Sequence, residues 1–126
     1  MNKLVKLFIT SISAITLALV SFTSSFAKVD GEYIVLGSAI SLTGKYSSNG
    51  VHTQNGYNMA VERINKMGGV NVGGKSYKFE IIYYDDESNP KRAAQLAERL
   101  IKQDGVHYML GPYSSGLTKA IAPVTE

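Results

Sequence analysis

The sequence has 126 residues, with 13 Lys and Arg against 10 Asp and Glu, and no cysteine. This length allows one small domain at most, and the absence of cysteine excludes a disulfide framework, a thiol nucleophile and a lipid-modified cysteine. Two of the basic residues, Lys3 and Lys6, lie at the very start, so the remainder is close to neutral. Its charge therefore gives no reason to expect nucleic acid or an anionic membrane surface as a partner.

The first residues have the layout of a secretory signal peptide. Two lysines precede an apolar stretch over residues 7–22, and the small residues Ser25 and Ala27 lie three and one before a cleavage point. The alternative is an uncleaved membrane anchor. However, the apolar stretch is shorter than the roughly 18 to 20 residues that span a bilayer, and Ser and Thr dilute it. We therefore expect residues 1–27 to be removed and residues 28–126 to form a soluble, exported domain.

Apolar strands then alternate with amphipathic helices. The apolar and β-branched residues 33–40 (YIVLGSAI) predict a strand buried on both faces of a sheet, and residues 41–50 (SLTGKYSSNG) predict a loop. The elements expected after this loop are a helix over 57–67 that ends at Gly68, a turn over 70–76, a strand over 77–84, a helix over 90–104, a strand over 106–110 and a helix that begins near Ser115. The order β-α-β-α-β-α predicts an α/β fold with a three-layer parallel sheet.

The pattern of the last helix still continues at Glu126, without a cap or a terminating glycine. Three strands also make a marginal core for a doubly wound sheet. We therefore expect residues 28–126 to be the truncated N-terminal lobe of a longer protein.

The order of the strands would create a binding position. If the second and third strands lie on opposite sides of the first, the direction of winding reverses between the first and third strands. Ligands of open α/β sheets bind at such a switch point, beyond the carboxyl ends of the strands. The segments 41–50 and 111–116 would then face each other there, and both are rich in small and hydroxyl residues. This convergence predicts a binding cleft.

The start of the last helix is the candidate anion site. A helix N-terminus offers unpaired N–H groups and partial positive charge, so the hydroxyls of Ser114, Ser115 and Thr118 would lie where a carboxylate could be held. The alternative is that Ser115 only caps its own helix. Tyr46 and Tyr113 fall in the two facing segments and are candidates for ligand contact, whereas we interpret the tyrosines within predicted strands and helices as core packing.

Residues 69–76 (GVNVGGKS) fit the phosphate-binding pattern G-x-x-x-x-G-K-[ST]. That loop must leave a strand and enter a helix, because the helix dipole and the loop amides hold the phosphates together. Here a helix precedes the motif and a strand follows it. We therefore interpret Gly73 and Gly74 as a tight turn.

Asp85, Asp86 and Glu87 could together bind Mg²⁺, because hard cations prefer several carboxylate oxygens. The alternative, which we favour, is that acidic residues stabilise the positive end of the following helix, with Asn89 as its cap. The two histidines of the chain have no partner nucleophile in the pattern. The sequence therefore predicts neither a catalytic site nor a metal site, and no cofactor.

Several stretches together carry a family resemblance. They are SLTGKYSSNG, INKMGGV, YYDDESNPKRA, LGPYSSGLT and IAPVTE, in this order along the whole mature region. The chain resembles the periplasmic leucine/isoleucine/valine-binding proteins, which are the branched-chain amino acid receptors of ABC importers. The resemblance implies part of the first lobe of a type I periplasmic binding fold. In this family two lobes close on a ligand by a hinge motion, and the liganded form docks on a membrane permease.

The resemblance also implies roles for particular residues. Ser115 corresponds to the serine whose hydroxyl and amide hold the ligand carboxylate, and Tyr113 and Ser114 line the pocket beside it. Asn49 stands where many relatives have an aromatic residue over the ligand, and this departure argues against a branched aliphatic side chain on the ligand. Pro123 lies inside the last helix, where we expect a tolerated kink.

The resulting expectation is a monomeric, non-enzymatic solute-binding protein of the periplasm, whose partners are a small amino acid, carboxylate or amide and an ABC permease. One alternative is the extracellular sensing domain of a receptor with the same fold. Another is a flavodoxin-like or phosphate-binding enzyme that uses the acidic cluster or the GVNVGGKS motif.

Overall fold

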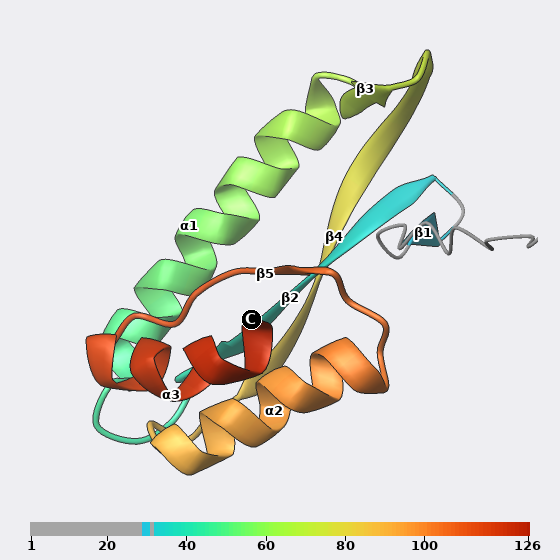
Figure 1. Ribbon diagram of the computed structural model, residues 1–126. Helices are drawn as coiled ribbons and strands as arrows, with labels where there is room; N and C mark the ends of the chain where they lie inside the picture. The colour runs from blue at the N-terminus through green and yellow to red at the C-terminus, as the bar shows by residue number, and fades with distance from the viewer. Residues whose placement is uncertain (1–28, 31) are drawn as a thin grey trace, which may run out of the picture.

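The computed structural model describes residues 29–30 and 32–126 (Figure 1). The predicted signal peptide lies outside the described residues. In chain order the elements are β1 (Val29–Asp30), β2 (Tyr33–Ile40), α1 (Ser47–Lys66), β3 (Val70–Val72), β4 (Lys75–Asp85), α2 (Pro90–Lys102), β5 (Tyr108–Met109) and α3 (Ser115–Thr125). No helix in this part of the chain combines the length and the hydrophobicity needed to cross a bilayer.

Strand β2 is the centre of the sheet and has β4 and β5 on opposite sides, both parallel to it. The predicted strand order and the reversal of winding are therefore confirmed. In the register of β2 and β4, Ile40 pairs with Asp85, so the two strands end level with each other. The third predicted strand is shorter than expected, because only Tyr108 and Met109 pair with β2. Val106, which precedes them, is nevertheless buried.

Two short antiparallel strands make the sheet mixed rather than purely parallel. β1 pairs with the start of β2, and β3 forms a hairpin with β4. The tip of this hairpin is Gly73–Gly74, with φ values of 61° and 85°, as a type I′ turn requires. The turn interpretation of these glycines is confirmed. A strand follows the motif where a phosphate-binding loop needs a helix.

Helix α1 begins at Ser47, ten residues before the predicted start, so the prediction of a loop through residue 50 was wrong. The first turns of α1 are mostly exposed and polar, and they therefore lack the apolar periodicity that marks a helix. Gly44, with φ 80°, turns the chain out of the sheet, and the Ser47 amide donates to its carbonyl at 3.2 Å. The predicted end of the helix at Gly68 is confirmed, with φ 99° at that residue.

Figure 1 shows α1 on one side of the strands and α2 and α3 on the other, which gives three layers. Most of the buried apolar side chains lie on the side of α2 and α3. The main cluster consists of Ala39, Ala93, Leu96, Ala97, Leu117 and Ile121. On the other side, Tyr57 and Val61 of α1 remain partly exposed and line an apolar groove of about 530 Å³ against Leu36 of β2. The packing that holds the sheet therefore comes mainly from α2 and α3.

Candidate ligand-binding site

The segments that follow β2 and β5 meet beyond the carboxyl ends of these strands. The β2–α1 segment (residues 41–46) ends at Tyr46, and residues 110–114 join β5 to α3. The ring centroids of Tyr46 and Tyr113 lie 6.3 Å apart at an interplanar angle of 55°, which is within the usual range of aromatic contacts. The predicted convergence of the two segments is therefore confirmed.

The N-terminus of α3 lies at this meeting point. Ser114 is its N-cap residue, with extended φ and ψ of −95° and 135°, and its side chain makes no cap hydrogen bond. Ser115 is the first helical residue and is exposed. The alternative that Ser115 caps its own helix is therefore wrong. Among the described residues, the Ser114 side chain thus leaves the first amides of α3 uncapped, at the position where the sequence predicts a carboxylate.

Tyr46 lies in an electropositive and hydroxyl-rich surrounding. The Lys45 ammonium lies 4.5 Å from the centroid of its ring. Hydrogen bonding by Lys45, and then by Ser114, lowers the pKa of the Tyr46 phenol below its ordinary value. The Tyr46 phenol therefore lies beside an ammonium group and a hydroxyl group where the two segments meet.

Two predicted site residues, Asn49 and Thr118, make contacts that the sequence pattern does not indicate. Asn49 lies in the first turns of α1, not in a loop, and its carbonyl accepts a hydrogen bond from the Thr53 hydroxyl at 2.9 Å. The hydroxyl of Thr118 turns back to the Ser114 carbonyl at 3.1 Å. Thr118 also lines a groove of about 610 Å³ beside β5 and α3. Contact of Asn49 and Thr118 with a ligand stays a prediction.

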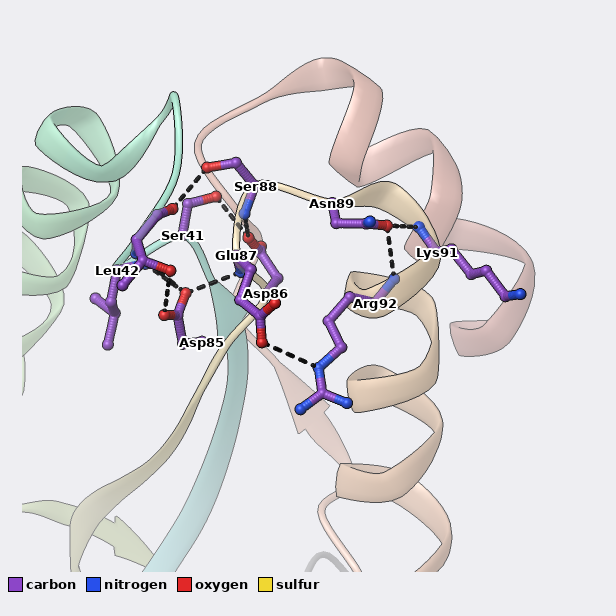
Figure 2. Close-up of polar contacts among 10 residues, drawn as sticks. Ser41, Leu42, Asp85, Asp86, Glu87, Ser88, Asn89, Lys91 and Arg92 are labelled. Atoms are coloured by element: carbon purple, nitrogen blue, oxygen red, sulfur yellow. Dashed lines mark hydrogen bonds and ion pairs between the residues drawn. The ribbon is translucent and has the colours of Figure 1, made fainter.

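The acidic turn (residues 85–88) bonds the β2–α1 segment through side chains whose long-range partners no local sequence pattern indicates (Figure 2). Asp85 Oδ1 accepts hydrogen bonds from the amides of Leu42 at 2.9 Å and Thr43 at 3.2 Å, and Oδ2 accepts one from the Thr43 hydroxyl at 2.7 Å. Asp85 Oδ1 also accepts from the Glu87 amide at 2.9 Å. The side chain of Asp85 thus joins the end of β4 to the β2–α1 segment.

Asp86 and Ser88 add to this junction. The Ser41 hydroxyl and the Ser88 amide donate to Asp86 Oδ1 at 2.6 and 2.8 Å. The Ser88 hydroxyl donates to the Thr43 carbonyl at 2.7 Å and accepts from the Tyr46 amide at 3.0 Å. The Tyr46 backbone is therefore held directly by the acidic turn.

The two carboxyl groups of this turn have opposite electrostatics. Burial favours the neutral form of Asp85, but the hydrogen bonds from Glu87, Thr43 and Leu42 outweigh it and lower the pKa. At Asp86, burial raises the pKa more than the Ser41 and Ser88 hydrogen bonds lower it, and the Asp85 charge adds to the rise. Asp86 Oδ2 is buried and has no hydrogen-bond partner among the described residues, which agrees with a carboxyl group that resists ionisation.

The favoured interpretation of Asn89 is confirmed. Its Oδ1 accepts from the amides of Lys91 at 2.9 Å and Arg92 at 3.1 Å, and Pro90 occupies the first turn of α2. Of the carboxylates before it, those of Asp85 and Asp86 bond the β2–α1 segment, whereas Glu87 Oε1 lies 3.7 Å from Arg92 Nε of α2. In the described ranges no three or more His, Asp or Glu side chains gather as metal ligands would.

Tyr57 also makes a contact that the sequence does not indicate. The sequence predicts core packing for this tyrosine, but its hydroxyl donates to the Gly111 carbonyl at 2.8 Å. Tyr57 thereby ties α1 to the segment after β5. Burial raises its pKa, so it stays a neutral donor at ordinary pH.

Comparison with known proteins places the chain in a family. Residues 34–126 match the periplasmic binding protein family. The chain is similar to a Leu/Ile/Val-binding protein of Rhizobium johnstonii, with 31% identity over 100 residues, which cover 79% of this chain and 26% of the relative. A leucine-, isoleucine-, valine-, threonine- and alanine-binding protein of Pseudomonas aeruginosa is 32% identical over 110 residues, which cover 87% of this chain and 28% of the relative.

A solved structure shows the same fold. It is a branched-chain amino acid transporter substrate binding protein from Streptococcus pneumoniae, in complex with isoleucine. It superposes with a TM-score of 0.64 at 30% identity and covers 71% of this chain and 25% of that structure. The chain spans about a quarter of the length of these curated relatives. Because the family match runs from β2 to the end of α3 and includes both facing segments, the chain belongs to the periplasmic binding protein family.

Proposed function

We propose that the chain supplies one side of the ligand site in the solute-binding component of an ABC importer. The ligand is a small amino acid or a related carboxylate or amide, which the protein captures in the periplasm and delivers to a membrane permease. The observation that carries this proposal is the uncapped N-terminus of α3 beside the Tyr46–Tyr113 pair. The names of the similar proteins from Rhizobium johnstonii and Pseudomonas aeruginosa support an amino acid as the ligand.

The mechanism is capture of a carboxylate by aligned donors. The Ser115 hydroxyl and the first amides of α3 donate to the carboxylate, and the positive end of the helix stabilises its charge. Tyr46 closes the opposite side from the β2–α1 segment. A second lobe then closes over the ligand by a hinge motion, so the affinity arises from both lobes.

Ligand binding is tested on the full-length protein encoded by the gene. Leucine, isoleucine, valine, threonine, alanine and small amides or organic acids are compared by thermal shift and calorimetric titration. A ligand at 100 times its Kd stabilises the folded state by about 2.7 kcal/mol. The methyl ester of the best amino acid is the matched control, because it keeps the side chain and lacks the charged carboxylate. No stabilisation by any of these compounds, or equal binding of the ester, would contradict the proposal.

Export is part of the same proposal. Residues 1–27 act as a signal peptide that is cleaved after Ala27, and the mature protein is a monomer in the periplasm. N-terminal sequencing of the protein released by osmotic shock should begin at Lys28. A protein that keeps residues 1–27 and stays with the membrane fraction would contradict this assignment.

A further inference from the structure

We propose that Asp85 and Ser88 are positioning residues of the candidate ligand-binding site. They hold the β2–α1 segment so that Tyr46 lies against Tyr113 before a ligand arrives. This inference rests on the proposed function, because it assigns both residues to the binding of the same ligand.

The backbone of the β2–α1 segment depends on the acidic turn for its hydrogen bonds. The amides of Leu42 and Thr43 donate to Asp85. Ser88 bonds the Thr43 carbonyl and the Tyr46 amide through one hydroxyl. Backbone groups that leave a sheet must find partners elsewhere. Here these partners are side chains of a turn that is more than 40 positions away in sequence.

The acidic turn has a defined and strained shape. Glu87 and Ser88 have φ values of 56° and 60°, which are uncommon for residues other than glycine. Such conformations persist where the surrounding contacts impose them. At Ser88 these contacts include its own amide, which donates to the buried carboxyl of Asp86. The turn can therefore act as a fixed frame.

The segment fits against this frame without spare room. A Cβ atom at Gly44 would lie 2.6 Å from the Glu87 carbonyl oxygen and 2.7 Å from the Ser88 hydroxyl, distances that real Cβ atoms essentially never show. Gly44 also has φ 80°, which favours glycine. Contact this close allows little movement of the segment while the Ser88 bonds are intact.

The consequence for binding follows from population arithmetic. The apparent Kd is the intrinsic Kd divided by the fraction of molecules in the competent conformation. If the loss of the Ser88 hydroxyl leaves Tyr46 in place in about a third to a tenth of the molecules, the apparent Kd rises about 3- to 10-fold. The intrinsic contacts of the amino acid with α3 do not change.

The experiment compares the Kd of the Ser88→Ala, Asp85→Ala and Asp85→Asn variants with that of the wild type, each as the full-length protein encoded by the gene. The probe is L-isoleucine, or the amino acid of the panel above that binds the wild type most tightly. We expect the Kd to rise about 3- to 10-fold for both alanine variants. Asp85→Asn should recover most of the affinity, because it keeps Oδ1 as an acceptor. Amide hydrogen exchange should become faster at Leu42, Thr43 and Tyr46 while the core of β2 stays protected.

Asn89→Ala is the matched control. Asn89 follows the acidic turn directly and caps α2, but its side-chain oxygen bonds Lys91 and Arg92 instead of the β2–α1 segment. This variant should be less stable than the wild type with an unchanged Kd. If the Kd of Asn89→Ala rises as much as that of Ser88→Ala, the loss of affinity in both variants follows from lower stability. This result would overturn the inference.

Two further outcomes separate the possible failures. If the wild type binds and the variants exchange faster at these amides with an unchanged Kd, the positioning role is wrong while the proposed function stands. If the wild type binds no amino acid of the panel, the proposed function fails and the positioning role fails with it. Thr43→Val removes only the exposed bond to Asp85 Oδ2. It therefore provides a folded variant if Ser88→Ala does not fold, and an unchanged Kd and unchanged exchange in it would also count against the inference.

Discussion

Gly50 and Gly56 lie in the same helix and should respond in opposite ways to the same added methyl group. A Cβ atom at Gly50 would lie 1.8 Å from the Ser41 carbonyl oxygen and 2.7 Å from its carbonyl carbon. At Gly56 the added Cβ would meet no described atom within 4 Å beyond its chain neighbours and the adjacent backbone of its own helix. Neither Gly50 nor Gly56 is among the glycines with a positive φ, so alanine causes no backbone strain of that kind at either position. The difference between the two variants therefore reports the close approach of α1 to the end of β2.

The magnitudes follow from two terms. Alanine is favoured over glycine inside a helix by about 0.8 to 1 kcal/mol, and Gly56→Ala should gain most of this. Gly50→Ala gains the same term but must push the Ser41 backbone away by more than about 1 Å, and overpacking of this kind costs about 1 to 3 kcal/mol or more. Because the obstacle is backbone rather than a flexible side chain, we expect the upper part of this range. The net loss for Gly50→Ala is then about 1 to 2 kcal/mol.

The free energy of unfolding is measured by urea titration followed by circular dichroism at 222 nm, for both variants and the wild type. A difference in the urea midpoint with an unchanged m-value reports stability alone. If Gly50→Ala is as stable as Gly56→Ala, α1 does not approach Ser41 as described, and the geometry that places Tyr46 would need revision.

Three further predictions concern the candidate ligand-binding site, the N-cap of α2 and the acidic turn. Ser115→Ala should weaken amino acid binding by about 1 to 3 kcal/mol with an unchanged circular dichroism spectrum, and an unchanged Kd in calorimetry would remove Ser115 from the site. Asn89→Ala should lower the free energy of unfolding by about 1 kcal/mol, because α2 loses the acceptor for the amides of Lys91 and Arg92. Asn89→Asp keeps a side-chain acceptor and should lose little stability. Equal losses for the two variants in urea titrations would contradict the capping role. The folded-state pKa of Asp85 is lowered from 3.8, so the stability that its ionisation provides is present above about pH 3.8 and is lost as the pH falls through the lower folded-state value. The stability difference between the wild type and Asp85→Asn should therefore shrink as the pH falls through this window, and a constant difference would exclude this origin.

The elements with a continuous apolar run or a clear apolar stripe were predictable from the sequence. Residues 33–40 and the stripe of α2 bury apolar side chains against each other, so their patterns report the fold directly. Glycine and proline marked several ends correctly, as at Gly68 and Pro90, because the backbone conformations that they favour occur at helix ends. The meeting of the segments after β2 and β5 was also predictable, because it follows from strand order alone.

The start of α1 and the role of the acidic turn could not be predicted from the sequence. The first turns of α1 are mostly polar and exposed, and their buried residue is Gly50, which has a low helix propensity. Neither hydrophobic pattern nor helix propensity therefore marks them. Asp85 and Ser88 contact residues 42 to 45 positions away. A run of acidic residues before a helix has a sufficient local explanation, and only the level register of β2 and β4 brings these side chains to Thr43 and Tyr46.

The Gly73–Gly74 hairpin tip offers a place to attach a reporter. It lies at the opposite end of β4 from the acidic turn (Figure 1), and the eleven residues of this strand separate the two by about 35 Å. Beyond its chain neighbours, a Cβ atom at either glycine would meet no atom of the described residues within 4 Å. The positive φ values make an insertion between the two glycines safer than a substitution. Because the chain has no cysteine, a single cysteine in such an insertion would carry a fluorescent dye at a position remote from the candidate ligand-binding site.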